Sequence, residues 1–219
     1  MIEVEADGFL FRFEDAIEAY VFDEKDKANP YYHSPPTKAV DVIAEFESDY
    51  VFIEIKDFDD PQLYNTLQYF SEEENRIRKD HFKWLKNYLK YKYRDTLLCR
   101  HAEQKADKPI RYVCLLVNFD NPLNLRLQQA LRSELPVGRK SRRWVKEIAS
   151  GCVVVNLEKW NERFSKWPVQ RLSSSVSSDS QVSQEQSFAF TLTPTVGSNN
   201  DVDPVTVAVP ESAGAALDN

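Results

Sequence analysis

The sequence predicts an α/β protein in which a mixed sheet is flanked by helices. Three observations predict this class. Apolar and polar residues alternate over residues 39–46 and 50–58, as they do in strands with one buried face. Two continuous apolar runs, 111–119 and 152–157, are typical of central strands covered on both sides. Helical patterns lie between and around these strands, and such interleaving is typical of a helix-covered sheet.

The first part of the chain is expected to hold a helix, a loop and a hairpin. Phe13 and Ile17 recur at helical spacing, which predicts a helix over residues 9–24. The Pro and Asn content of residues 23–38 predicts a loop. Residues 47–49 suit the short turn of a hairpin between the two alternating strands.

A long helix is expected over residues 72–98. Ser71 and Glu74 have the spacing of a capping box at its start. Its buried stripe is expected to contain Leu85, Leu89 and Tyr93. Three further helical segments are expected at residues 123–135, in the second half of the basic segment 139–148, and at 158–167.

The composition changes sharply after residue 172. Residues 173–219 are rich in Ser, Pro, Thr and Asp and contain no Lys or Arg. Such a segment buries too little apolar surface to offset the entropy of ordering it. The sequence therefore predicts a folded domain over residues 1–172 and a disordered acidic tail over 173–219.

The 219-residue chain shows no sign of a membrane or secretory protein. No apolar run approaches the length of a membrane span, and the acidic N-terminus lacks the features of a signal peptide. The three cysteines are widely spaced, which is atypical of a disulfide framework or a CxxC metal site. These features predict a cytoplasmic protein that does not contact a membrane.

Charge is distributed very unevenly along the chain. The balance of basic over acidic residues is −13 over residues 1–80, +12 over 81–171 and −6 over 172–219. A basic region of this kind favours contact with a polyanion such as nucleic acid. Association of the acidic and basic halves in a homodimer is an alternative explanation.

Three charged residues in the predicted hairpin form the candidate catalytic centre. Side chains alternate along a strand, so Glu54 and Lys56 point to the same face, and a short hairpin brings Asp41 beside them. Two neighbouring carboxylates repel each other unless a cation lies between them, and carboxylate oxygens suit Mg²⁺ or Mn²⁺. A lysine at the same place can orient water or stabilise a phosphate.

This pattern resembles that of the PD-(D/E)xK nuclease superfamily. Asp41 matches the strand aspartate of the family, and Glu54-Ile-Lys56 matches its (D/E)xK element. Residues 13–17, Phe-Glu-Asp-Ala-Ile, are similar to the helix motif of Holliday-junction resolvases in that group. This similarity implies Glu14 as a third metal ligand, with Glu18 as the reserve candidate. The resemblance implies a restriction-endonuclease-like mixed sheet flanked by helices and the cofactor Mg²⁺ or Mn²⁺.

The basic half supplies candidate contacts to a phosphate backbone. Such contacts give affinity that is independent of sequence and sensitive to salt. Lys92 is expected to be exposed beside other basic residues of the long helix, and nearby Trp84, Tyr88, Tyr91 and Trp144 are able to stack on unpaired bases. The candidate nucleic-acid-binding residues are Lys83, Lys86, Lys90, Arg94, Arg139, Lys140, Arg142, Arg143 and Lys146.

Together these features predict a metal-dependent nuclease, with DNA favoured over RNA as its substrate. The roles assigned are metal ligation by Glu14, Asp41 and Glu54, and assistance to the attacking water by Lys56. The alternative is a catalytically inactive module of the same fold that binds nucleic acid or a protein partner.

Overall fold

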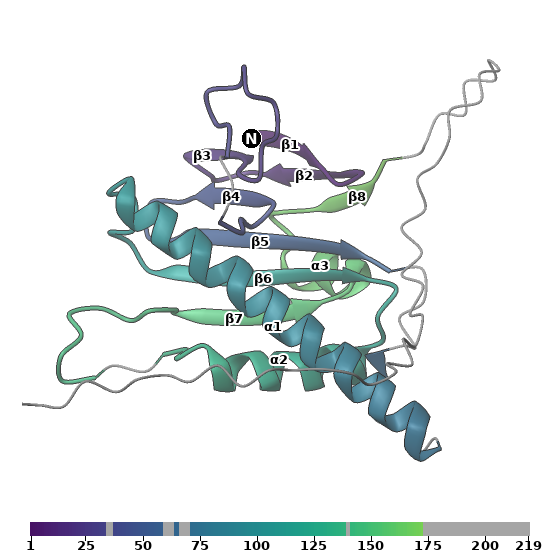
Figure 1. Ribbon diagram of the computed structural model, residues 1–219. Coiled ribbons are helices and arrows are strands. Elements are labelled where there is room, and N and C mark those ends of the chain that lie inside the picture. The colour runs from purple at the N-terminus through teal and green to yellow at the C-terminus, as the bar shows by residue number, and fades with distance from the viewer. Residues whose placement is uncertain (34–36, 59–63, 66–70, 139–140, 173–219) are drawn as a thin grey trace, which may run out of the picture. The chain divides into compact units, whose positions relative to one another are not determined.

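Five strands form the main sheet of the protein, in the order β3-β4-β5-β6-β7. The first three are antiparallel neighbours, and the last three are parallel neighbours. The computed structural model describes residues 1–33, 37–58, 64–65, 71–138 and 141–172 (Figure 1). The bounds of these strands are β3 Glu18–Val21, β4 Val42–Glu45, β5 Tyr50–Asp57, β6 Ile110–Val117 and β7 Gly151–Val155. The mixed α/β architecture expected from the sequence is thus confirmed.

Two helices connect the parallel strands. Helix α1 (Glu72–Ala102) lies between β5 and β6 in the sequence, and α2 (Asn121–Glu134) lies between β6 and β7. The capping box expected at the start of α1 is present, since Ser71 and Glu74 bond reciprocally. A third helix, α3 (Leu157–Arg163), follows β7 directly. Figure 1 shows α1 crossing in front of the sheet and α3 behind it.

A second, three-stranded sheet corrects the helix predicted over residues 9–24. Its strands are β1 (Ile2–Ala6), β2 (Phe9–Phe13) and β8 (Val169–Arg171), in the order β1-β2-β8. The residues of the expected helix instead form β2, a turn and β3. The connection between β1 and β2 is a tight turn in which Asp7 and Gly8 both have positive φ, at 47° and 76°. That geometry matches the two-residue hairpin turn for which Asp-Gly is favoured.

The five-stranded sheet is covered on both faces. On one face, Leu89 and Tyr93 of α1 and Leu127 of α2 belong to the same core as Phe52. On the other face, Ile53 belongs to a second core, with side chains of the three-stranded sheet and α3. Residues 52, 54 and 56 of β5 therefore face α1, while residues 51, 53 and 55 face the smaller sheet.

Two predicted segments do not match the structure or lie outside it. No helix forms over residues 141–148, where the chain instead makes turns and bends. Arg139, Lys140 and the predicted tail over 173–219 lie outside the described residues. All the described elements belong to one unit, Met1–Ser175.

Candidate functional site

The hairpin of β4 and β5 brings Asp41 and Glu54 together beneath α1. Asp41 immediately precedes β4, and its backbone N–H donates to the carbonyl oxygen of Ile53 at 3.0 Å. Its side-chain Oδ2 accepts a hydrogen bond from the backbone N–H of Ile55 at 2.6 Å. Glu54 lies in the middle of β5 and is fully buried. Backbone pairing of two strands therefore fixes both carboxylates.

Lys92 of α1 lies between these carboxylates. Its Nζ is 3.3 Å from Asp41 Oδ1 and 3.3 Å from Glu54 Oε2. A third carboxylate, Asp23 Oδ2, lies 3.5 Å from the same Nζ. Lys92 is only 5% exposed, so the expectation that it lies on the exposed side of the helix is wrong. The ammonium group offsets negative charge that would otherwise be buried without compensation.

Lys56 also pairs with Glu54, and it is more accessible to solvent than Lys92. Its Nζ lies 3.4 Å from Glu54 Oε1, and its side chain is 27% exposed, compared with 7% for that of Lys92. The Nζ also lies 5.3 Å from the centre of the Tyr88 ring on α1. Lys56 is therefore the cation of the site that is better placed to meet a ligand arriving from solvent.

The electrostatics of the site follow from its burial. Burial, and then the neighbouring Asp41, raise the pKa of Glu54 to about 8. Burial also raises the pKa of Asp41, against the effect of Lys92. For Lys92 itself, burial favours a lower pKa, but the charges of Glu54 and Asp41 outweigh that effect and raise it. Lys92 therefore stays charged, whereas the raised pKa of Glu54 keeps that carboxyl protonated up to about pH 8.

Glu14 and Glu18 are not brought to this group. Glu14 is exposed in the turn between β2 and β3 rather than on a helix. The pairing of β3 with β4 sets Glu18 opposite Glu45, at the far end of β4 from Asp41. Asp23, just beyond the other end of β3, is instead the third carboxylate near the pair. Asp23 is not among the predicted site residues, because its sequence surroundings are typical of a helix end followed by a loop.

The donor set can be compared with the needs of a divalent cation. Asp41 and Glu54 present hard oxygen atoms to one point. The two Glu54 oxygens are ion-paired, Oε1 with Lys56 at 3.4 Å and Oε2 with Lys92 at 3.3 Å, but neither accepts a hydrogen bond among the described residues. These are features of a site for Mg²⁺ or Mn²⁺. Within the described ranges, however, no group of three or more His, Cys, Asp or Glu side chains is arranged to hold a metal ion. The carboxylate pair fits such an ion only if Lys92 yields its place.

The basic residues expected to bind phosphates fall into two groups. Lys86 and Lys90 both pair with Glu134 of α2, at 2.6 and 3.1 Å, and so connect the two helices. The others that the structure describes are exposed: Lys83, Arg94, Arg142, Arg143 and Lys146. These five side chains are accessible to a polyanion, whereas Lys86 and Lys90 are partly neutralised.

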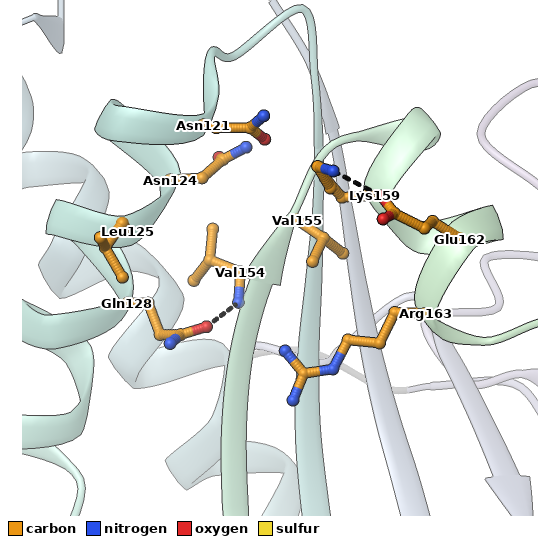
Figure 2. A pocket seen from close by; sticks show the side chains of 9 residues that line it. All are labelled: Asn121, Asn124, Leu125, Gln128, Val154, Val155, Lys159, Glu162 and Arg163. Carbon is orange, nitrogen blue, oxygen red and sulfur yellow. Dashed lines mark hydrogen bonds and ion pairs between the residues drawn. The ribbon is translucent and has the colours of Figure 1, made fainter.

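A separate cavity of about 460 Å³ lies among α2, β7 and α3 (Figure 2). Gln128 accepts a hydrogen bond from the backbone N–H of Val154, which satisfies a donor on the edge strand. The buried amide of Asn124 has no hydrogen-bond partner in the part of the chain that the structure describes. This cavity is not lined by Asp23, Asp41, Glu54, Lys56 or Lys92, so it is distinct from the site that these five residues form.

Comparisons with known proteins find no match: no family model, no curated protein and no solved structure is sufficiently similar to the chain. Among the helices of the described ranges, none has the length and apolar character needed to cross a membrane.

Proposed function

We propose that the protein hydrolyses phosphodiester bonds in nucleic acid, with DNA favoured, at a site formed by Asp41, Glu54 and Lys56. The observation that carries this proposal is the convergence of the three side chains from adjacent strands on one face of the sheet. The resemblance to the PD-(D/E)xK nucleases supports it in part, because the expected hairpin, helix and further strand follow one another here. The helix that the resemblance places before the hairpin does not form, since strands β2 and β3 occupy its residues.

Each residue has a role that follows from its position. Asp41 and Glu54 are the groups that would hold Mg²⁺ or Mn²⁺. The chemistry supplied by a bound divalent cation is activation of water and stabilisation of negative charge on the phosphate. Lys56, the more accessible cation, would orient the water or contact the phosphate. Lys92 keeps the carboxylates neutralised before the ion arrives, and entry of the ion requires its ammonium group to move.

The position of the Lys92 ammonium group between Asp41 and Glu54 supports a second candidate function. An ammonium group that stays between Asp41 and Glu54 takes the place of a metal ion, and the fold then serves as a binding module without catalysis. In that case the exposed basic residues would still bind nucleic acid through its phosphates. The two candidates differ in whether the carboxylate pair binds a divalent cation.

Calorimetric titration with Mn²⁺ tests the proposal. The chain is expected to bind Mn²⁺, while Asp41→Ala and Glu54→Ala each abolish binding. Glu14→Ala is the matched control, because it removes an exposed carboxylate outside the group and should leave binding unchanged. The same variants are then assayed for cleavage of DNA and RNA with Mg²⁺ or Mn²⁺.

Two results would contradict the nuclease proposal. One is the absence of Mn²⁺ binding by the folded chain, both alone and with a short DNA duplex present. The other is metal-dependent cleavage that persists unchanged in Glu54→Ala. Binding of nucleic acid without metal binding or cleavage would support the binding module instead.

A further inference from the structure

Three aromatic side chains form a row along one side of α1. Trp84, Tyr88 and Tyr91 are spaced i, i+4 and i+7, so they lie above one another on the helix surface. At ~1.5 Å per residue the row is about 10 Å long. Trp84 is 53% exposed and Tyr91 is 43% exposed, whereas most large apolar side chains of α1 are buried or half-buried. The Trp84 ring stacks on Tyr88, with 5.3 Å between centroids.

The row lies on the flank of α1 that is next to Asp41, Glu54 and their lysines, and not on the flank next to α2. The stripe that contains Leu85 and Leu89 packs on the sheet, and Lys86 extends from the opposite flank to Glu134 of α2. The remaining flank carries the aromatic row and is adjacent to Lys92. Tyr88 joins the row to the site, because its ring centre lies 5.3 Å from Lys56 Nζ and 5.6 Å from Lys92 Nζ.

Cationic groups accompany the rings along the row. Lys38 Nζ lies between two of them, 4.9 Å from the centre of Tyr88 and 5.8 Å from that of Tyr91. The guanidinium of Arg94 lies 5.9 Å from the centre of the Tyr91 ring. Acidic residues are also near the row: Glu54 acts electrostatically on Tyr88, and Asp95 accepts a hydrogen bond from the backbone N–H of Lys38. The row therefore presents flat apolar surfaces and positive charges that continue as far as Lys56.

We propose that this row binds single-stranded nucleic acid, with unpaired bases stacked on Trp84 and Tyr91 and phosphates held by Lys38 and Arg94. Unpaired nucleotides expose both a flat base and a phosphate, and stacking on aromatic side chains is tolerant of sequence. In a duplex the base faces are covered by their neighbours, so only the phosphates remain available to the row. This inference rests on the proposed function, since it names the form of nucleic acid that the Asp41–Glu54–Lys56 site receives.

Fluorescence anisotropy with the full chain in EDTA tests this proposal without metal or cleavage. The probes are labelled dT and rU oligonucleotides of about 12 nucleotides and a DNA duplex of the same length. Both single strands, or one of them, are expected to bind at least about fivefold more tightly than the duplex. Loss of one stacked base corresponds to roughly 5- to 150-fold in affinity, so Trp84→Ala and Tyr91→Ala should each weaken single-strand binding at least about fivefold.

Two further variants separate stacking from a structural effect. Trp84→Phe keeps a ring and should restore most of the affinity lost in Trp84→Ala. Leu125→Ala removes another exposed apolar side chain, 54% exposed on α2, and should change nothing. Duplex binding as tight as single-strand binding, absence of binding to all three probes, or unchanged binding by both alanine variants of the row would overturn the proposal. None of these results depends on the metal titration, so the two proposals can fail separately.

Discussion

Replacing Lys92 with Met tests the balance of charge on which the candidate site depends. At 3.3 Å and an effective dielectric constant of ~20, each of its pairs with Asp41 and Glu54 is worth about 5 kcal/mol before desolvation is subtracted. Removing one partner of a buried ion pair costs roughly 3–5 kcal/mol. Because Glu54 can take up a proton in place of the lost cation, we expect the lower end, about 3 kcal/mol at pH 8.

The loss should shrink in acid, since protonated carboxylates no longer need Lys92. We therefore expect the stability difference between wild type and Lys92→Met to fall by more than half between pH 8 and pH 5. Urea unfolding at several pH values measures it, with the free energy taken from midpoints at constant slope. Lys83→Met, on the exposed surface of the same helix, is the control and should stay within ~0.5 kcal/mol of wild type.

Mn²⁺ provides a second readout of the same variant. If the carboxylates form a metal site, removing the competing ammonium should strengthen binding, and Mn²⁺ at ~100 times its dissociation constant should add ~2.7 kcal/mol of stability. A Lys92→Met protein as stable as wild type at pH 8, with no dependence of the difference on pH, would refute the assignment of Lys92 as the buried counter-ion.

Other substitutions test separate parts of the fold. Glu54→Gln should flatten the dependence of the free energy of unfolding on pH. The folded wild type keeps a proton on Glu54 up to about pH 8, whereas the unfolded chain loses it near pH 4.5. Wild-type stability should therefore fall by at most about 5 kcal/mol as pH rises from about 4.5 to 8, with Lys92 charged throughout. Urea titrations at several pH values, with EDTA present, measure this. The same change of unfolding free energy with pH in wild type and Glu54→Gln would contradict the prediction. Gly8→Ala should cost ~1–2 kcal/mol through its positive φ alone, because open space surrounds the added Cβ, whereas Gly151→Ala should cost less; thermal denaturation compares them. Ser71→Ala should cost ~0.5–2 kcal/mol by removing the cap of α1, measured by the same method, and an unchanged melting temperature would count against that cap.

The main sheet and its candidate site were largely predictable because their local patterns agree with their environment. Alternation in the hairpin correctly sets Glu54 and Lys56 on one face of β5, and the spacing of Leu85 and Leu89 correctly marks the buried side of α1. The same stripe also contains Lys92, seven residues after Leu85. A lysine on an apolar stripe is the signal that would have identified the counter-ion.

The three-stranded sheet was missed because two kinds of periodicity overlap in its sequence. Phe13 and Ile17 are four residues apart, as in a helix, but Ile17 is exposed and Phe13 belongs to a strand. The alternating residues 2–6 followed by Asp7-Gly8 form a recognisable hairpin signal. Strand β8 has only three residues and is defined by its partner β2, so no local pattern could have identified it.

The pairing of β8 with β2 has a consequence for synthesis of the chain on the ribosome. Phe11 pairs with Val169, and at roughly 5–20 residues per second the ribosome needs about 10–30 s to make the approximately 160 residues between them. During that time the first hairpin has an unpaired edge, and its phenylalanines lack the cover of Trp160 and Trp167. The β1–β2 hairpin is thus made early but completed late, and its apolar side chains keep part of their exposure until α3 and β8 have been synthesised.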